Sequence, residues 1–411
     1  MRLTSVVFLI ALAYAAPALA QDAGTRAGEA ERQRGEKAKQ LEPYKPGKVE
    51  GGLLYFEEHF LAERLFNPPR GLFTRFGGMP EGQGFTVGPA YRISNYDYSF
   101  TTSAAVSLKG AWEVASRLEF PRPTAPLMAV AKPRTFFSVG AVYHELPQED
   151  FYGIGQDSSV DQRISYLMDE ALVDATGGVA PAKWFTVAGT AEYRSQRPGP
   201  GKDLLVPSIE AVFDEGTAPA FQTDVDLLRL GGAALVDYSH AYQGAPVGGR
   251  YLFTYSKYLD QTEELFSFTR WDVDLQQYIP IFTPSRLIAL RAHAAGVTPD
   301  AGNTVPFYLQ PSLGGSHSIR AYPVQRFRDQ HSLLLQGEYR FRLNDFMTGA
   351  LFYDTGKVVF NRDDLWNLDG AKEDYGISVR LGFAGIAALR AEIVFGGDEG
   401  IVYALRFSDV F

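Results

Sequence analysis

Residues 332–342 read SLLLQGEYRFR, and apolar side chains recur in them at every second position. One set of alternate positions is apolar, namely Leu333, Leu335, Gly337, Tyr339 and Phe341. The other set is largely polar, namely Ser332, Leu334, Gln336, Glu338, Arg340 and Arg342. Side chains alternate between the two faces of a β-strand, so this period predicts a strand with one apolar and one polar face.

The same period of two recurs along most of the chain from Gly51 onward. It predicts strands near residues 51–60, 84–93, 96–108, 110–120, 133–143, 160–175, 181–196, 224–238, 248–259, 265–279, 285–296, 331–342, 346–359, 374–383, 388–396 and 400–411. These segments number about sixteen, and single-chain membrane barrels contain an even number of strands. Long connections, such as 197–223 and 297–330, alternate with short ones, as the outer loops and periplasmic turns of barrels do.

Two all-β architectures share this alternation. A soluble sandwich buries its apolar faces, whereas a transmembrane barrel turns them to lipid and keeps the polar faces in the lumen. The chain contains 29 Phe and 22 Tyr, and they are dense near strand ends, as interfacial aromatic belts require. We therefore predict a transmembrane antiparallel β-barrel over residues 51–411. The charges expected on its lumenal faces are Glu192, Arg194, Arg250, Glu338, Arg340, Arg342, Arg380, Arg390, Glu392 and Arg406.

The two ends of the chain agree with export to the outer membrane. Residues 1–20 have a cation, Arg2, then a short apolar run and small residues up to Ala20, which is the pattern of a cleaved signal peptide. Residues 21–50 are charged and carry no apolar face, so we interpret them as a short polar periplasmic segment. Residues 401–411 alternate again and resemble the C-terminal sorting signal of outer-membrane barrels. The residues on its apolar face are Tyr403, Leu405, Phe407 and Phe411.

The composition excludes several kinds of chemistry. The 411 residues contain no Cys, which excludes thiolate metal sites and thiol catalysis. The net charge is −9, so nucleic acid is not an expected partner. The six His have no metal-ligand spacing on one strand face. Ser316, His317 and Ser318 are adjacent, yet no nucleophile elbow frames them. We expect no metal, no cofactor and no enzymatic activity.

A glycine-rich stretch at 150–159 reads DFYGIGQDSS. Its carboxylates, with Asp161, are fewer than the oxygen ligands that calcium takes. We interpret it as a loop that re-enters a strand.

Residues 314–329 and the strands after them resemble a known family. The segment GGSHSIRAYPVQRFRD, followed by LLLQGEYRF and LFYDTGKVV, resembles the BamA/TamA superfamily of outer-membrane assembly factors, also called bacterial surface antigens. The resemblance is strongest over residues 310–411. In that family a long loop between the eleventh and twelfth strands folds back into the lumen. Its tip corresponds here to Ile319, Arg320, Ala321 and Tyr322, with alanine where the family has glycine.

The resemblance implies partners for Arg320. The family's next two strands supply carboxylates, which correspond to Glu338 and to Asp354 within the pattern from Phe352 to Gly356. By alternation both carboxylates can face the lumen. The guanidinium group has five donors in a planar fork and can engage two carboxylates. We therefore predict that Arg320 latches the inserted loop to the wall.

Three functions remain open from the sequence. A BamA-like barrel would assist the insertion or translocation of outer-membrane proteins or lipids, with a lateral seam between its first and last strands. Only about thirty residues separate the signal peptide from the barrel, too few for the POTRA domains that the family's assembly factors usually carry. The alternatives are a passive or gated diffusion pore, and a structural barrel that docks a separate periplasmic partner through residues 21–50. The expected partners are outer-membrane lipids, and nascent outer-membrane proteins or that periplasmic protein.

Overall fold

A computed structural model describes residues 68–121, 134–242, 245–344, 346–383, 386–397, 400–406 and 410–411, together with Glu29, Arg32, Gln33 and Glu36. The chain divides into two units, Met1–His59 and Phe60–Phe411, which we describe separately. In the first unit the four described residues are helical and exposed. The predicted signal peptide and the first predicted strand, 51–60, lie outside the described residues.

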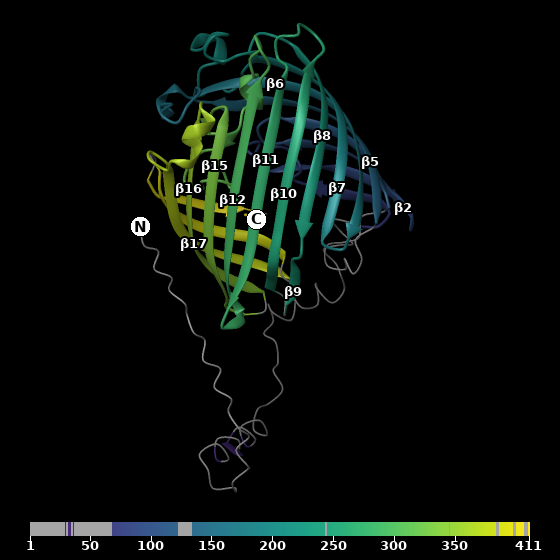
Figure 1. Cartoon of the computed structure of the whole chain (residues 1–411), viewed down its shortest axis with the longest axis vertical. Helices are drawn as coiled ribbons and strands as arrows, with labels where there is room; N and C mark the ends of the chain where they lie inside the picture. The colour runs from purple at the N-terminus through teal and green to yellow at the C-terminus, as the bar shows by residue number, and fades with distance from the viewer. Residues whose placement is uncertain are drawn as a thin grey trace, which may run out of the picture. The chain divides into compact units, whose positions relative to one another are not determined.

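The second unit is built on one large antiparallel sheet (Figure 1). Among its seventeen described strands, sixteen form a wall, and the short strand β9 (His240–Tyr242) pairs antiparallel with the start of β10. The wall strands are β1 (Gly71–Phe76), β2 (Thr86–Ser94), β3 (Ser99–Ser107), β4 (Trp112–Phe120), β5 (Thr135–Phe151), β6 (Ile164–Ala182), β7 (Phe185–Pro200), β8 (Val225–Asp237), β10 (Ala245–Asp260), β11 (Phe268–Ile281), β12 (Thr283–Pro299), β15 (His331–Arg342), β16 (Met347–Val359), β17 (Lys372–Phe383), β18 (Ile386–Gly396) and β19 (Val402–Arg406).

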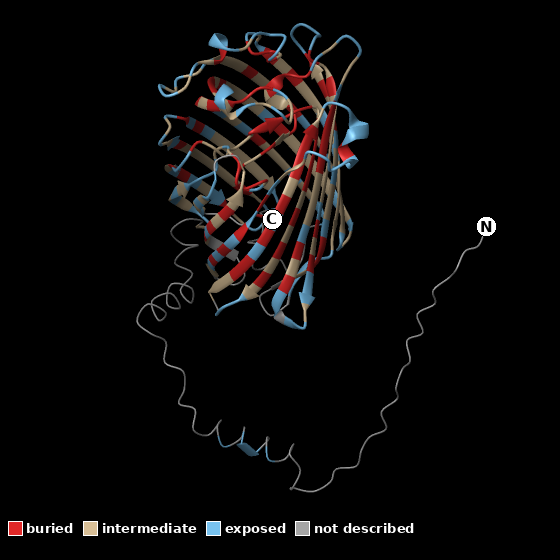
Figure 2. Ribbon diagram, turned by 90° about the vertical axis from the view of Figure 1, so that its left-hand side faces the viewer, coloured by how far each residue is buried: buried red, intermediate tan, exposed pale blue. Residues whose placement is uncertain are grey.

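Each wall strand pairs with the next one along the chain. The registers run from β1–β2 through β8–β10 and β12–β15 to β18–β19, so β1 and β19 are the two ends of the series. Figures 1 and 2 show the wall curving around an interior. The predicted all-β barrel class is confirmed. Fifteen of the sixteen predicted strands have a counterpart, and the wall strand that the sequence did not predict is β1.

The two faces of the wall differ as the alternation predicts. On β16 the side chains of Leu351 and Tyr353 are exposed on the outside, whereas Phe352 and Asp354 are buried inside. The outer face is therefore apolar, as a face in contact with acyl chains must be. Among the described residues, no helix is long and apolar enough to cross a membrane.

The connection between β12 and β15 folds into the interior. It contains the short helix η4 (Phe307–Leu309) and a small hairpin of β13 (Ser312–Leu313) and β14 (Phe327–Arg328). Because β12 and β15 are the eleventh and twelfth wall strands, this inserted loop lies where the family resemblance places it.

The interior is less polar than the alternation suggests. Apolar side chains of the inserted loop pack against inward-facing apolar residues of β15, β16 and β18. Together they form one buried cluster of Leu313, Ile319, Ala321, Tyr322, Phe327, Leu334, Phe352, Val358 and Val394. Phe307 joins a second cluster, where its ring centroid lies 4.6 Å from that of Phe151. The loop thus stays inside partly by burying apolar surface.

Candidate functional site

Arg320 lies at the centre of the contact between the inserted loop and the wall. Its Nε donates to Asp354 Oδ2 at 2.6 Å and its Nη2 donates to Asp354 Oδ1 at 3.0 Å. Its Nη1 lies 2.9 Å from Glu338 Oε1. The side chain thus contacts both carboxylates that the sequence singled out, and all three side chains are inaccessible to solvent.

A third carboxylate and an aromatic ring complete the surroundings of Arg320. Its Nη1 also donates to Glu392 Oε1 at 2.9 Å, and its Cζ lies 3.5 Å from the centre of the Phe352 ring. Phe352 therefore supports the flat face of the guanidinium group while the carboxylates occupy its edges. Burial lowers the pKa of Arg320, but the charges of the three carboxylates raise it more, so the net shift is upward.

The carboxylates around Arg320 hold further cations of the wall. Glu338 Oε2 lies 2.7 Å from Arg340 Nε and 2.7 Å from Arg380 Nη2. Glu392 lies 3.1 Å from Arg390 Nε and, through its other oxygen, 3.2 Å from Arg406 Nε. Four of the lumenal arginines that the sequence identified therefore pair with wall carboxylates, namely Arg340, Arg380, Arg390 and Arg406.

The backbone next to Arg320 is held by a residue that sequence reasoning did not connect with the loop. The Ala321 N–H donates to Asp374 Oδ2 at 2.9 Å, and Asp374 is the register partner of Asp354 on the neighbouring strand. The sequence did carry one signal: Asp374 and Arg380 are an even number of positions apart on β17, so both face inward. Alternation does not say, however, which of the inward side chains reaches the loop.

The tip of the loop turns tightly without glycine. Tyr322 N donates to Ile319 O at 3.4 Å, which closes a turn around Arg320 and Ala321. Ala321 is not among the described non-glycine residues with positive φ. An alanine therefore fits this turn although the family has glycine there.

Gly356 lies where Leu313 of the inserted loop approaches β16. A Cβ atom built on it would lie 2.9 Å from both Leu313 Cδ1 and the Leu333 carbonyl oxygen. Real Cβ atoms essentially never approach so closely, so glycine leaves the room that Leu313 of the loop needs.

Other segments also contact the inserted loop. In the predicted loop at 150–159, Gly155 N donates to Arg328 O at 2.7 Å, and Ser158 Oγ accepts from Arg326 at 2.9 Å. Glu81, between β1 and β2, accepts from Ser316 N at 2.5 Å and lies 3.5 Å from Arg406 Nη1 on β19. Both ends of the wall thus contact one another through side chains beside the loop.

The last residues of the chain correct one sequence prediction. Tyr403 and Leu405 are exposed on the outside of β19, as the proposed sorting signal requires, but β19 ends at Arg406 and Phe407 lies outside the described residues. Phe411 does not share their face. Its ring lies 6.4 Å from that of Tyr278, below the Arg340 guanidinium at 5.1 Å, in the interior where both figures place the C-terminus.

The prediction for Phe411 assumed that residues alternate between the two faces as far as the end of the chain. This alternation applies only within an extended strand. Val410 is buried, and its carbonyl oxygen lies 3.1 Å from His317 Nδ1 of the inserted loop. Val410 and Phe411 therefore lie inside, whereas Tyr403 and Leu405 face outward. Within the described ranges, no group of three or more Asp, Glu or His side chains could hold a metal ion.

Residues 241–400 match the family model described as the Omp85 superfamily domain. The segment contains Arg320 and all four carboxylates that contact the loop tip. A search of curated protein sequences finds no significant match.

Among solved structures, the fold is similar to the crystal structure of BamA from Haemophilus ducreyi lacking POTRA domains 1-3. The TM-score is 0.59 at 12% identity, over 82% of this chain and 69% of that one. CdiB from Escherichia coli matches at a TM-score of 0.47 and 14% identity, over 84% of this chain and 61% of that one. CdiB from Acinetobacter baumannii matches at 0.44 and 12%, over 78% and 55%.

The family model places the domain, and the BamA match shows the barrel fold around it. Residues 241–400 therefore match the Omp85 superfamily domain, and the likeness to BamA shows that the chain has a β-barrel fold.

Proposed function

We propose that this barrel assists the insertion of outer-membrane proteins through a lateral seam between β1 and β19. The supporting observation is the shortness of the two end strands. As described, β1 has six residues and β19 five, whereas β5, β6 and β7 have 17, 19 and 16. A strand that crosses a bilayer needs about 9–11 residues.

Short end strands make the wall weak at this point. Each unsatisfied backbone group in hydrocarbon costs several kcal/mol, so a strand that pairs with the seam is stabilised there. The side-chain contact of Glu81 with Arg406 spans the same two ends at 3.5 Å. In this mechanism the Arg320 latch keeps β15–β18 rigid while the seam opens beside them, and the clients are nascent outer-membrane proteins.

A cross-link tests the seam. The chain has no Cys, so Leu72→Cys on β1 and Tyr403→Cys on β19, both exposed on the outside, can be joined by a flexible bis-maleimide in detergent. The matched control joins Leu351→Cys to Ile377→Cys, which are register partners on β16 and β17. After reconstitution into liposomes, the folding rate of a second outer-membrane barrel is measured by its heat-modifiable gel mobility.

We expect the seam cross-link to abolish the acceleration of client folding and the control cross-link to preserve it. Equal acceleration by both cross-linked proteins would exclude insertion through the β1–β19 seam.

The second candidate function is a gated diffusion pore. It is favoured by the paired charges on the wall away from the latch, where Arg194 lies 3.3 Å from Glu170 and Arg291 lies 2.6 Å from Asp274. Steady conductance that grows when residues 314–326 of the inserted loop are deleted, without any acceleration of client folding, would favour the pore.

A further inference from the structure

Arg286 lies near the end of β12 that is opposite to the inserted loop. β12 begins at Thr283, directly after the short connection at Phe282, whereas the inserted loop follows the other end of the strand. Short connections are the periplasmic turns of a membrane barrel, so Arg286 lies near the periplasmic rim of the wall.

The side chain of Arg286 points outward. Its register partner on β15 is Phe341, and Leu287 beside it is buried in the interior, in the cluster that Phe411 joins. Because neighbouring residues of a strand face opposite sides, Arg286 faces the membrane, and its side chain is exposed.

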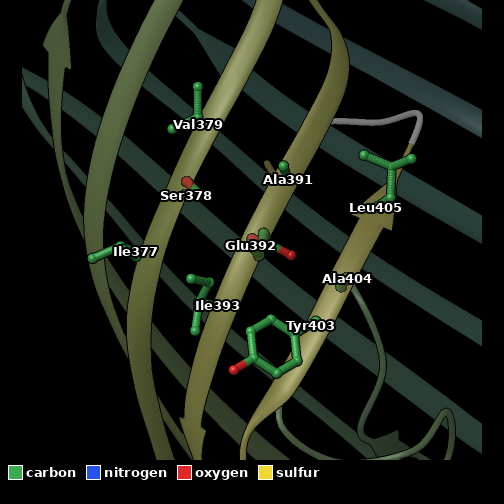
Figure 3. A pocket seen from close by; sticks show the side chains of 9 residues that line it. All are labelled: Ile377, Ser378, Val379, Ala391, Glu392, Ile393, Tyr403, Ala404 and Leu405. Carbon is green, nitrogen blue, oxygen red and sulfur yellow. The ribbon is translucent and has the colours of Figure 1, made fainter.

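Arg286 stands at the lower boundary of an apolar band. The next outward positions of β12 carry no charge, namely Ile288, Leu290, Ala292, Ala294 and Gly296. This run is as long as the roughly 9–11 residues that a tilted strand needs to cross a bilayer. Figure 3 shows a comparable outer face on the last strands, where Ile377, Ile393 and Leu405 are apolar. Arg286 therefore lies at the depth of the lipid headgroups.

Within the described part of the chain, the guanidinium group of Arg286 has no hydrogen-bond or ion-pair partner. Outward-facing cations near the opposite rim differ, because they pair with carboxylates. Arg197 Nη1 lies 2.9 Å from Asp226 Oδ1, and Lys257 Nζ contacts Asp300 Oδ1. The charge of Arg286 is therefore available to an external anion.

A bulge at the start of β12 places further donors beside Arg286. The register with β11 shifts near the turn, and residues 284–286 have no partner on that strand. Thr283 Oγ1 lies 2.8 Å from Ser285 Oγ, and both side chains are exposed. Bulges commonly re-aim side chains, and hydroxyl and guanidinium groups are donors that suit the oxygens of a phosphate group.

The rim around Arg286 selects the kind of headgroup. Residues 275–290, 339–344 and 346–353, which form the described ends of β11, β12, β15 and β16 at this rim, contain no Asp or Glu. Since an ammonium group would find no carboxylate there, a zwitterionic headgroup gains little. The periplasmic leaflet of an outer membrane consists of phospholipids, and a cation near a membrane surface attracts the anionic ones.

We propose that the periplasmic end of β12 binds an anionic phospholipid of the periplasmic leaflet, whose phosphate group contacts Arg286 and the hydroxyls of Thr283 and Ser285. Its acyl chains lie along the apolar band that begins at Ile288. The exposed ring of Phe282 lies in the adjacent turn, as aromatic side chains at a membrane interface do. β12 is the eleventh wall strand and not one of the end strands β1 and β19, so the site stands or falls independently of the insertase proposal.

Native mass spectrometry of the full chain tests the site. The purified protein is delipidated and incubated with phosphatidylglycerol or phosphatidylethanolamine of identical acyl chains, and the retained lipid is counted. Arg286→Gln removes the cation. The matched control is Arg250→Gln, which removes an exposed cation near the same rim that faces the lumen, since its register partner Gln276 is buried inside. Heat-modifiable mobility checks that each variant folds.

We expect Arg286→Gln to lower phosphatidylglycerol retention about fivefold, equivalent to about 1 kcal/mol, and Arg250→Gln to leave it unchanged. Arg286→Lys keeps the charge and should keep most of the retention. Equal retention by Arg286→Gln and wild type, equal losses in both glutamine variants, or equal retention of the two lipids by wild type would overturn the proposal. If Arg286→Gln does not fold, Arg286→Ser takes its place and the same comparison decides.

Discussion

Removal of the Arg320 side chain tests the latch most directly. Three carboxylates surround it. Asp354 forms its ion pair with Arg320, whereas Glu338 and Glu392 also form ion pairs with other arginines. Asp354 is held by Arg320 through both of its oxygens. Glu338 also pairs with Arg340 and Arg380, and Glu392 also pairs with Arg390 and Arg406.

The cost of Arg320→Ala should therefore arise mainly at Asp354. Breaking a buried ion pair by removing one partner costs about 3–5 kcal/mol, because a charge remains buried without its partner. Loss of the stack on Phe352 adds to this. Arg320→Lys keeps a charge but loses the planar fork, so its cost should lie between wild type and alanine.

Double-mutant cycles separate the three carboxylates. We expect a coupling energy of about 2–3 kcal/mol between Arg320→Ala and Asp354→Asn, and less than about 1 kcal/mol for the cycles with Glu338→Gln or Glu392→Gln. The assay is urea unfolding of the barrel in detergent micelles, followed by tryptophan fluorescence and by heat-modifiable mobility. Wild-type stability in Arg320→Ala, or equal coupling to all three carboxylates, would refute this reasoning.

Three further changes test neighbouring contacts. Asp374→Ala should lower the free energy of unfolding by about 1–3 kcal/mol in the same assay, because the buried N–H of Ala321 loses its acceptor. Asp374→Asn keeps an acceptor oxygen and should retain most of the wild-type stability. Equal stability of the two variants would contradict this reasoning. Gly356→Val should cost about 1–3 kcal/mol, because its side chain collides with Leu313, and the double variant with Leu313→Ala should be more stable than Gly356→Val alone, which unfolding curves can show. Phe411→Ala should cost about 1 kcal/mol through lost packing in the interior, and it should speed amide exchange of Tyr278 and its neighbours; unchanged exchange would place the ring elsewhere.

The candidate site could be predicted in part. Alternation put Glu338 and Asp354 on inward faces, and the family resemblance pointed to Arg320 as their partner. Alternation also places Asp374 and Glu392 on inward faces. It does not tell how far each inward side chain lies from the loop. That ranking depends on the β15–β18 registers and on where the loop tip lies, and the chain separates Arg320 from Glu392 by 72 positions.

By itself, the sequence determined the strand pattern and the apolar outer face, because a period of two is a local property of extended backbone. The location of the inserted loop followed from the family resemblance. Only the tertiary structure decided that β1 begins the described wall, since six residues contain too few periods to stand out before they pair with β2. It also decided that Phe411 lies inside, against Tyr278. These features depend on contacts between residues distant in the chain, and no local pattern encodes such contacts.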